Sequence, residues 1–183
     1  MSEEMIIKYC APTLAGLKTG SMFVCDYKDK YDLLDEIRAY NRMLVPKGLR
    51  LIPMRIQNDK AIIYVYRVSS LESDLKDKRA FKVLKEKGYP CDRQSECVSC
   101  LKKHINAQSE FPHEVGLFLG YPPEDVIGFI DNNARNYKYC GPWKVYGNIS
   151  KAKKTFAIFK KCTGNFENRH KNGVPIRELT VAG

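Results

Sequence analysis

The chain has 183 residues, of which 44% are hydrophobic and 28% charged, a balance typical of a folded globular protein and not of a disordered chain. Its longest apolar runs, such as AIIYVY at 61–66, are far shorter than the ~18 residues that cross a bilayer. Acidic residues stand near the start, where a secretory signal carries lysines, and seven cysteines in such a chain fit a reducing compartment. We therefore expect one cytoplasmic globular domain over residues 1–183 and no membrane partner.

The first half of the chain reads as alternating helices and strands. Hydrophobic periodicity predicts a helix over 3–16, a strand over 21–27 and an amphipathic helix over 28–45. The apolar face of the second helix is predicted to contain Tyr31, Leu34, Ile37, Leu44 and Val45.

A β-hairpin is the clearest local prediction. Strands over 50–57 and 60–67 are joined through Asn58 and Asp59, which tolerate tight-turn geometry. The second strand is apolar on both faces, which predicts a central position covered by helices on at least one side. On the first strand, the residues predicted to point inward are Ile52, Met54 and Ile56.

The second half is predicted to be mainly helical, with one short strand. Helices are expected over 69–87, 95–107 and 151–162, a helical hairpin over 111–133 and a strand over 143–147. The last dozen residues are polar and are expected to run along the surface as a tail. The fold class is therefore α+β: a small mixed or antiparallel sheet with a central hairpin, covered by helices, plus a C-terminal helical hairpin region.

The hairpin sequence FPHEVGLFLGYPPEDVIGFI (111–130) has the spacing of a helix-turn-helix, with Gly116, Gly120 and Val126 at the small, turn and β-branched positions. A DNA-reading second helix would present donors to phosphates and base edges. Here that helix begins with Pro122, Pro123, Glu124 and Asp125. The carboxylates of Glu124 and Asp125 repel phosphate. We therefore expect a structural hairpin or partner surface and not sequence-specific DNA binding.

Cysteine and histidine residues provide candidates for catalysis. Cys10, Cys140 and His113 could form a thiol-dependent enzyme, and Glu114 could serve as a carboxylate partner of His113. Adjacent residues on a helix point about 100° apart, so His113 and Glu114 do not automatically converge on one substrate. CGPW (140–143) has the form of a thioredoxin motif without its second cysteine, so dithiol exchange within the motif is not possible. We expect both Cys10 and Cys140 to be buried.

Cys91, Cys97, Cys100 and His104 follow the spacing C-x5-C-x2-C-x3-H and are donors suited to zinc. Structural zinc sites usually combine two separated pairs of ligands, and this segment supplies only one compact group. We therefore expect no bound metal, with these four residues as the candidates if zinc is the cofactor.

Two basic features point to anionic partners. The formal net charge is +10, and one predicted helix contains a cluster of lysines, Lys151, Lys153, Lys154, Lys160 and Lys161. This helix could bind nucleic acid without sequence preference, or its lysines could simply form a solvated face. GLKTGS (16–21) has the residues of a phosphate loop in the wrong order, yet Lys18 and Thr19 could still donate to an anion.

Four phrases together resemble a known family, the bacterial domain of unknown function 3793 of anaerobic Firmicutes. They are CAPTLAGLKTGSMF (10–23), FPHEVGLFLGYPPEDVIGFI (111–130), WKVYGN (143–148) and AKKTFAIFKKC (152–162). The resemblance covers essentially the whole chain and implies no activity or catalytic residue set. The family pattern includes Cys10, His113-Glu114 and Trp143-Lys144, whereas a cysteine at 100 is not typical of it, which weakens the case for a family-wide zinc site.

The leading functional hypothesis is a non-enzymatic binding module for a small anionic ligand or a protein partner. Its predicted ligand-binding residues are Lys18, Thr19, His113 and Glu114. The alternatives are a thiol- or metal-dependent enzyme that uses Cys10, Cys140 and His113, and nonspecific nucleic-acid binding through the lysine-rich helix. The sequence does not show whether residues 10–20, 113 and 140 meet in space, and it leaves the oligomeric state open.

Overall fold

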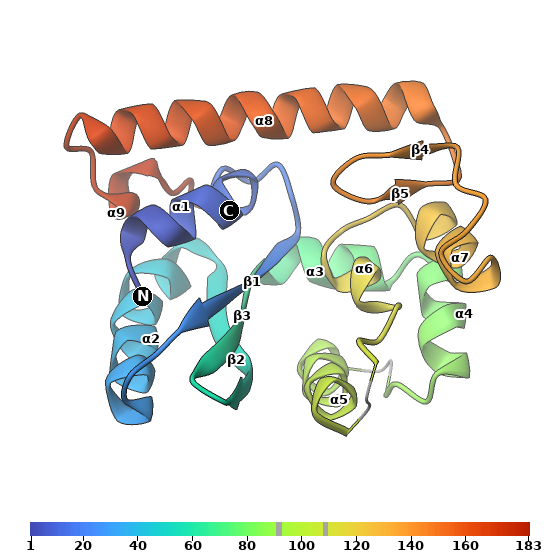
Figure 1. The fold of residues 1–183 in the computed structure, drawn as a ribbon, viewed down its shortest axis with the longest axis horizontal. Coiled ribbons are helices and arrows are strands. Elements are labelled where there is room, and N and C mark those ends of the chain that lie inside the picture. Colours follow the sequence, from blue (N-terminus) through green and yellow to red (C-terminus); the bar gives the residue numbers. More distant parts are fainter. Residues whose placement is uncertain (91–92, 108–109) are drawn as a thin grey trace. The chain divides into compact units, whose positions relative to one another are not determined.

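In the computed structural model, which describes residues 1–90, 93–107 and 110–183, the contacts divide the chain into two compact units. The first unit comprises residues 1–70 and 159–183, and the second comprises residues 71–158. The fold is α+β, as the sequence predicts, with a small antiparallel sheet and a larger number of helices (Figure 1). That the two units fold as a single domain stays a prediction.

The first unit contains the main sheet and the helices that flank it in sequence. Its elements are α1 (Glu3–Leu14), β1 (Gly20–Asp26), α2 (Lys30–Leu44), the 3-10 turn η1 (Val45–Lys47), β2 (Leu49–Gln57), β3 (Lys60–Arg67), the start of α3 (Val68–Leu75), residues 159–171 of α8 (Ile149–Lys171) and α9 (Ile176–Leu179).

The sheet is antiparallel with strand order β1-β3-β2, so the predicted hairpin is confirmed and its second strand is central (Figure 1). Asn58 and Asp59 form the turn with φ values of 53° and 58°, the left-handed geometry that a two-residue hairpin requires. Every residue of β3 after Lys60 is buried, which explains why its sequence is apolar on both faces.

The inward face predicted for β2 is partly wrong. Leu49 and Leu51 are fully buried in the core of this unit, whereas Ile52 is only half-buried. A register shift between Pro53 and Arg55 then moves the buried position to Met54. Proline has no N–H to donate to a ladder, so an irregularity at this position is physically reasonable, and strict alternation across it fails.

Helix α2 also differs from its predicted apolar face. Asp29 caps the helix by accepting from the backbone N–H groups of Tyr31 and Asp32, which places Tyr31 in the solvent-facing first turn at 77% exposure. Val45 is exposed as well, and the buried positions of the helix are Leu33, Ile37 and Leu44.

The last residues do not form a surface tail, which corrects that expectation. Ile176 and Leu179, one turn apart on α9, are buried in the core of the first unit. The buried Arg67 guanidinium donates to the carbonyl groups of Thr13, Leu14 and Val181 and so holds this segment against α1. Although the C-terminal segment is mostly polar in composition, Ile176 and Leu179 stand at helical spacing, and their burial is sufficient to anchor it.

The second unit contains the rest of α3, α4 (Lys78–Glu86), α5 (Gln94–Ala107), α6 (Val115–Phe118), α7 (Pro123–Asp131), β4 (Tyr139–Cys140), β5 (Lys144–Val145) and residues 149–158 of α8. The single helix predicted over 69–87 is two helices. Asp77 accepts from the N–H groups of Arg79 and Ala80 and therefore begins α4 as its N-cap.

The helical hairpin predicted over 111–133 is present as α6 and α7, but its first helix is a single turn that begins only at Val115. Gly120 ends the first helical turn with a φ of 74°. A Cβ atom at Gly116 would lie 2.8 Å from a methyl group of Val126, so the glycine permits the two helices to approach closely. The glycine spacing that resembles a helix-turn-helix therefore has a packing reason of its own.

Candidate functional site

A cavity of about 750 Å³ lies within the second unit, between the segment before α6, helix α7 and the β4–β5 hairpin. This volume is within the range of small-molecule sites, which runs from roughly 300 to 1,000 Å³. The walls are largely aromatic and aliphatic, and the polar residues among them are few. The lining includes Phe111, Val115, Tyr121, Val126, Phe129 and Trp143, together with Glu110, His113, Asp125, Cys140 and Lys144.

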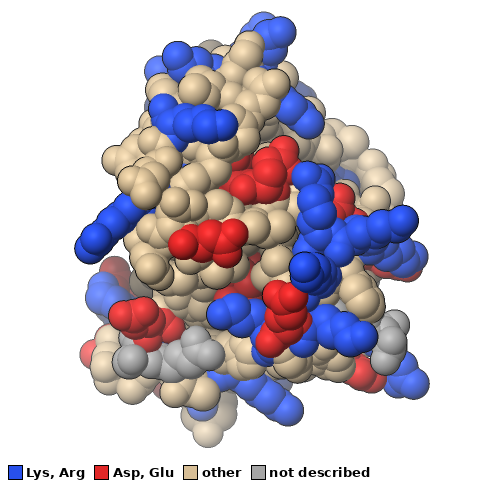
Figure 2. Space-filling view, turned by 90° about the vertical axis from the view of Figure 1, so that its right-hand side faces the viewer, with Lys and Arg blue, Asp and Glu red and all other residues tan. Residues whose placement is uncertain are grey.

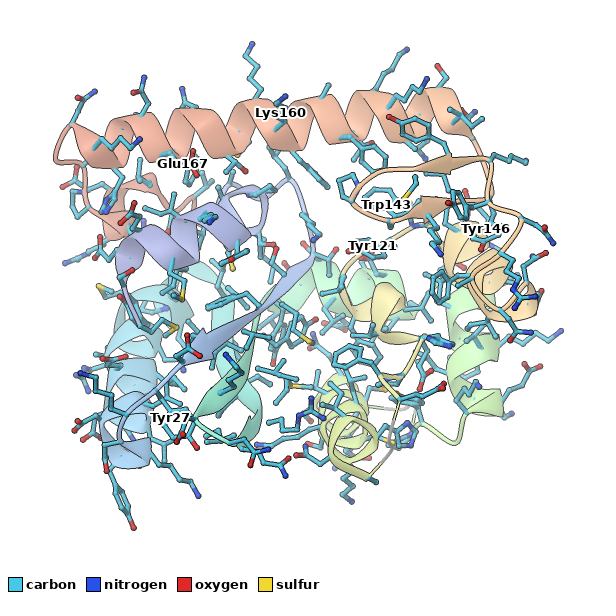
Figure 3. All side chains as sticks on the ribbon, viewed as in Figure 1. Tyr27, Tyr121, Trp143, Tyr146, Lys160 and Glu167 are labelled. Carbon is cyan, nitrogen blue, oxygen red and sulfur yellow. The ribbon has the colours of Figure 1, made fainter. Side chains whose placement is uncertain are left out.

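The indole of Trp143 is the centre of the aromatic wall. Its ring stacks on Tyr121 with centroids 4.6 Å apart, and the two side chains lie together in Figure 3. Phe156 of α8 meets the same indole edge to face at 4.4 Å. Gly141 leaves room for Phe156, because a Cβ atom there would lie 2.3 Å from its ring. Rings held from several sides lose little freedom when a ligand binds.

Asp125 fixes this wall from within helix α7. Its carboxylate is 3% exposed, and Oδ2 accepts from the indole Nε1 of Trp143 at 2.8 Å. Oδ1 accepts from the backbone N–H groups of Tyr146 and Gly147 at 2.8 and 2.7 Å. An anion in the first turn of a helix is also stabilised by the helix dipole. Asp125 therefore holds the Trp143 ring and the backbone just after β5 against α7.

Two cationic or titratable side chains join the apolar lining. The Lys144 ammonium donates to the carbonyl of Ala134 at 2.8 Å and lies 4.8 Å from the centroid of the Tyr137 ring. An ammonium has three N–H donors, so this hydrogen bond leaves donors for a ligand. His113 packs edge to face on Phe129 at 5.0 Å, and its ring nitrogens have no protein hydrogen bond within the described residues.

Cys140 lines the cavity but is exposed, so the expectation of a buried thiol is wrong. It belongs to the two-residue strand β4, whose pairing with β5 leaves Cys140 uncovered. Cys10 is buried, as expected, and lies in the first unit. Burial raises the pKa of Cys10 to about 12, against a smaller lowering by Lys18, so this thiol is not ionised near neutral pH.

His113 and Glu114 diverge, as expected of neighbours on a helical turn. His113 lines the cavity, whereas the carboxylate of Glu114 is buried and accepts a hydrogen bond from the Tyr89 hydroxyl at 2.9 Å. The two side chains therefore have different surroundings, His113 at the cavity and Glu114 at the Tyr89 hydroxyl.

The candidate zinc ligands are only partly described. Cys91 lies outside the described residues. Cys97 is buried and donates to the carbonyl of Pro90, while the Cys100 sulfur lies 3.7 Å from Nε2 of His104. Within the described part of the chain, His, Cys, Asp and Glu side chains form no group of three that could hold a metal ion.

The predicted anion loop lies in the first unit. Thr19 is buried, and burial lowers the pKa of Lys18 to about 8, with a smaller opposing effect of Cys10. Neither residue lines the cavity of the second unit, so the structure does not bring the loop and His113 into one site there.

The five lysines of the predicted basic helix are all exposed on α8. Lys151, Lys153 and Lys154 belong to the second unit, whereas Lys160 and Lys161 belong to the first. On the face shown in Figure 2, acidic side chains lie among the basic ones, so positive charge is not continuous over it. No helix among the described residues is both long and apolar enough to span a membrane.

Most residues of the cavity were not assigned to a site from the sequence, and the most important of these are Tyr121, Asp125 and Trp143. Asp125 was interpreted only as a carboxylate that repels phosphate. A signal was present, because the chain contains a single tryptophan and it stands in a turn-rich segment, CGPW, where a large ring needs a specific partner.

Comparison with known proteins gives a family but no activity. A family model described as "Protein of unknown function (DUF3793)" matches residues 6–180. Neither the curated proteins nor the solved structures contain a significant match to the chain.

Proposed function

Because the chain belongs to the DUF3793 family, whose description names no activity, we propose its function from its geometry: it binds a small organic molecule in the cavity of the second unit. The observation that carries this proposal is an aromatic cavity of about 750 Å³ in which the Trp143 ring is held in place by Asp125. Because the side chains of this wall are already ordered, a ligand binds without the entropy cost of ordering them.

The chemistry of the lining favours a particular class of ligand. Tyr121, Phe129 and Trp143 offer ring faces and edges that suit a planar or aromatic body. Lys144 and His113 supply donors at the polar positions, which suit a carboxylate, sulfonate or phosphate substituent. We propose an aromatic anion, a narrower class than the small anionic ligand expected from the sequence.

Titration with anilinonaphthalene sulfonate, an aromatic anion, tests the proposal through Trp143. The chain has one tryptophan, so excitation at a wavelength that tyrosine does not absorb reports on the cavity alone. We expect saturable quenching of the tryptophan emission with energy transfer to the probe. Phe129→Ala should weaken binding about fivefold or more, because a ring contact contributes about 1 kcal/mol or more.

Matched variants distinguish the cavity from nonspecific adsorption. Phe81→Ala removes a 39% exposed ring on α4, outside the cavity, and should leave the affinity unchanged. Lys144→Gln should weaken binding of the anion, whereas Lys138→Gln, at an exposed lysine of the same hairpin segment, should not. Equal effects of Phe129→Ala and Phe81→Ala would contradict the proposed site.

A second candidate, a thiol-dependent enzyme, is favoured by one observation: Cys140 and His113 line the same cavity. We rank it below ligand binding because a Cys–His catalyst needs a base that is oriented toward the sulfur, and no described residue holds the His113 ring by a hydrogen bond. Rapid alkylation of Cys140 that His113→Ala abolishes would reverse this ranking.

A further inference from the structure

A hydrogen-bonded chain of four side chains joins α5 to the segments on either side of it, and none of the four lines the cavity. Cys100 and His104 stand one turn apart on α5, with Sγ 3.7 Å from Nε2. The other ring nitrogen of His104, Nδ1, lies 3.1 Å from the Tyr89 hydroxyl and 3.4 Å from Oε1 of Glu114. A thiol therefore meets one side of an imidazole, and a carboxylate meets the other.

The protons in this chain can be assigned from its donors and acceptors. Tyr89 donates to Glu114, and its pKa is raised by burial and then by Glu114, so the hydroxyl keeps its proton near neutral pH. The hydroxyl oxygen and the carboxylate are then both acceptors for Nδ1 of His104. Nδ1 therefore carries the imidazole proton, and the lone pair of Nε2 faces the Cys100 thiol.

From this geometry we infer that Cys100 is a site of thiol–disulfide exchange with a small disulfide, with His104 as its general base and Glu114 and Tyr89 as positioning residues. The arrangement of nucleophile, base and orienting group is the one that activates thiols. Cys97, one turn earlier, is 2% exposed and donates to the Pro90 carbonyl, so it is not the accessible thiol of α5.

The exchange step is balanced without any further reactant. As Sγ of Cys100 attacks one sulfur of the small disulfide, its proton passes to Nε2 of His104. The new S–S bond forms as the old one breaks, and the leaving thiolate takes the proton back from Nε2. The products are a mixed disulfide on Cys100 and one free small thiol.

The charges around Cys100 explain why a base is required. Burial raises the pKa of the Cys100 thiol, the Glu114 carboxylate raises it further, and Lys103 on α5 lowers it. The thiol is therefore protonated at rest, and reaction depends on transfer of its proton to His104 as the sulfur attacks. A neutral mixed disulfide also places no new charge beside Glu114.

Cys162 on α8 provides a matched internal reference. It is half-buried like Cys100, burial raises its pKa in the same way, and no hydrogen bond to it occurs within the described residues. Treating the folded full-length protein with dithiodipyridine near neutral pH, with site-resolved mass spectrometry over time, compares the two thiols directly. We expect Cys100 to react at least about tenfold faster, since general bases contribute rate factors of about a hundred or more.

Substitution of the base and of its partners completes the test. His104→Gln should lower the Cys100 rate to that of Cys162 and leave the Cys162 rate unchanged. Glu114→Ala should slow Cys100 several-fold, whereas Glu114→Gln, which keeps an acceptor for Nδ1, should restore most of the rate. A merely structural role for Glu114 would not produce that rescue.

Three results would overturn the inference. They are equal rates for Cys100 and Cys162 in the unmodified protein, a Cys100 rate that His104→Gln does not change, and equal effects of Glu114→Ala and Glu114→Gln. If His104→Gln fails to fold, which rapid labelling of the buried Cys10 would reveal, the comparison within the unmodified protein decides alone. None of these results bears on ligand binding in the cavity.

Discussion

Replacing Asp125 with asparagine should increase the mobility of the Trp143 ring while keeping some of the hydrogen bonds that the carboxylate accepts. The two carboxylate oxygens have separate partners: Oδ1 accepts from the N–H groups of Tyr146 and Gly147, and Oδ2 accepts from the Trp143 indole. An asparagine can keep its carbonyl oxygen toward the two backbone donors. Its amide nitrogen then faces the indole N–H, so two donors oppose each other.

The size of the effect follows from the bonds that are lost. A hydrogen bond to a charged group contributes about 1.5–3 kcal/mol, and Trp143 is only half-buried, so water can replace part of it. We expect Asp125→Asn to lower the free energy of unfolding by about 1–2 kcal/mol, and Asp125→Ala, which removes all three bonds, by about 2–4 kcal/mol.

Urea unfolding followed by circular dichroism gives the stability, and acrylamide quenching of the single tryptophan gives the freedom of the ring. Asp125→Asn should increase quenching in the folded state. Glu124→Gln is the matched control, because it neutralises the neighbouring carboxylate, which pairs with Arg79 at the surface. Wild-type stability and quenching in Asp125→Asn would refute the view that this carboxylate holds the cavity wall.

Three further predictions concern packing and ionisation. Gly116→Ala should lower the free energy of unfolding, measured in urea, by about 1–3 kcal/mol, because its Cβ would lie 2.8 Å from a methyl group of Val126. Adding Val126→Ala should restore part of this loss, and additive losses would contradict the contact. Ile176→Ala should cost about 2–5 kcal/mol, whereas a loss below about 0.5 kcal/mol would indicate that the C-terminal segment does not pack in the core. The pKa of Cys10 is raised to about 12 by burial, so the folded state retains a proton that the unfolded state releases above pH ~9. The stability of the wild type relative to Cys10→Ala should therefore fall by about 1.4 kcal/mol per pH unit from there toward pH 12, and a constant difference would contradict burial of this thiol.

The sequence correctly predicts those structural elements that are determined by residues close together in the chain. Asn58 and Asp59 specify a two-residue turn, and the apolar strand after them specifies the centre of the sheet. Local rules also place Gly120 at the end of a helical turn. In each case the residues that form the element also determine its geometry.

Predictions fail where a specific contact that periodicity and composition do not describe decides the outcome. Tyr31 fits the apolar face of α2 by periodicity, yet the cap at Asp29 places it in solvent. The C-terminal segment is polar in composition, yet Arg67, more than a hundred residues away in sequence, supplies the donors for its Val181 carbonyl. Periodicity and composition contain no information about such contacts.

The candidate site shows the same division. His113 and Cys140 are recognisable as reactive residue types, and both line the cavity. Asp125 could not be assigned in this way, because its role depends on three donors that stand about 20 residues later, on either side of β5. Cys140 was expected to be buried because it stands between Tyr139 and the Gly-Pro turn that leads to Trp143, whereas the short β4–β5 pairing exposes it.

Backbone amide chemical-shift mapping with anilinonaphthalene sulfonate tests the central claim most directly, because it locates the bound aromatic anion on the chain without substitutions. Binding in the cavity should produce saturable shifts at Val115, Tyr121, Phe129, Trp143 and Lys144, with the Trp143 indole N–H among the largest. Shifts centred instead on other exposed apolar side chains, such as Phe81 or Ile158, or shifts that do not saturate, would contradict the account.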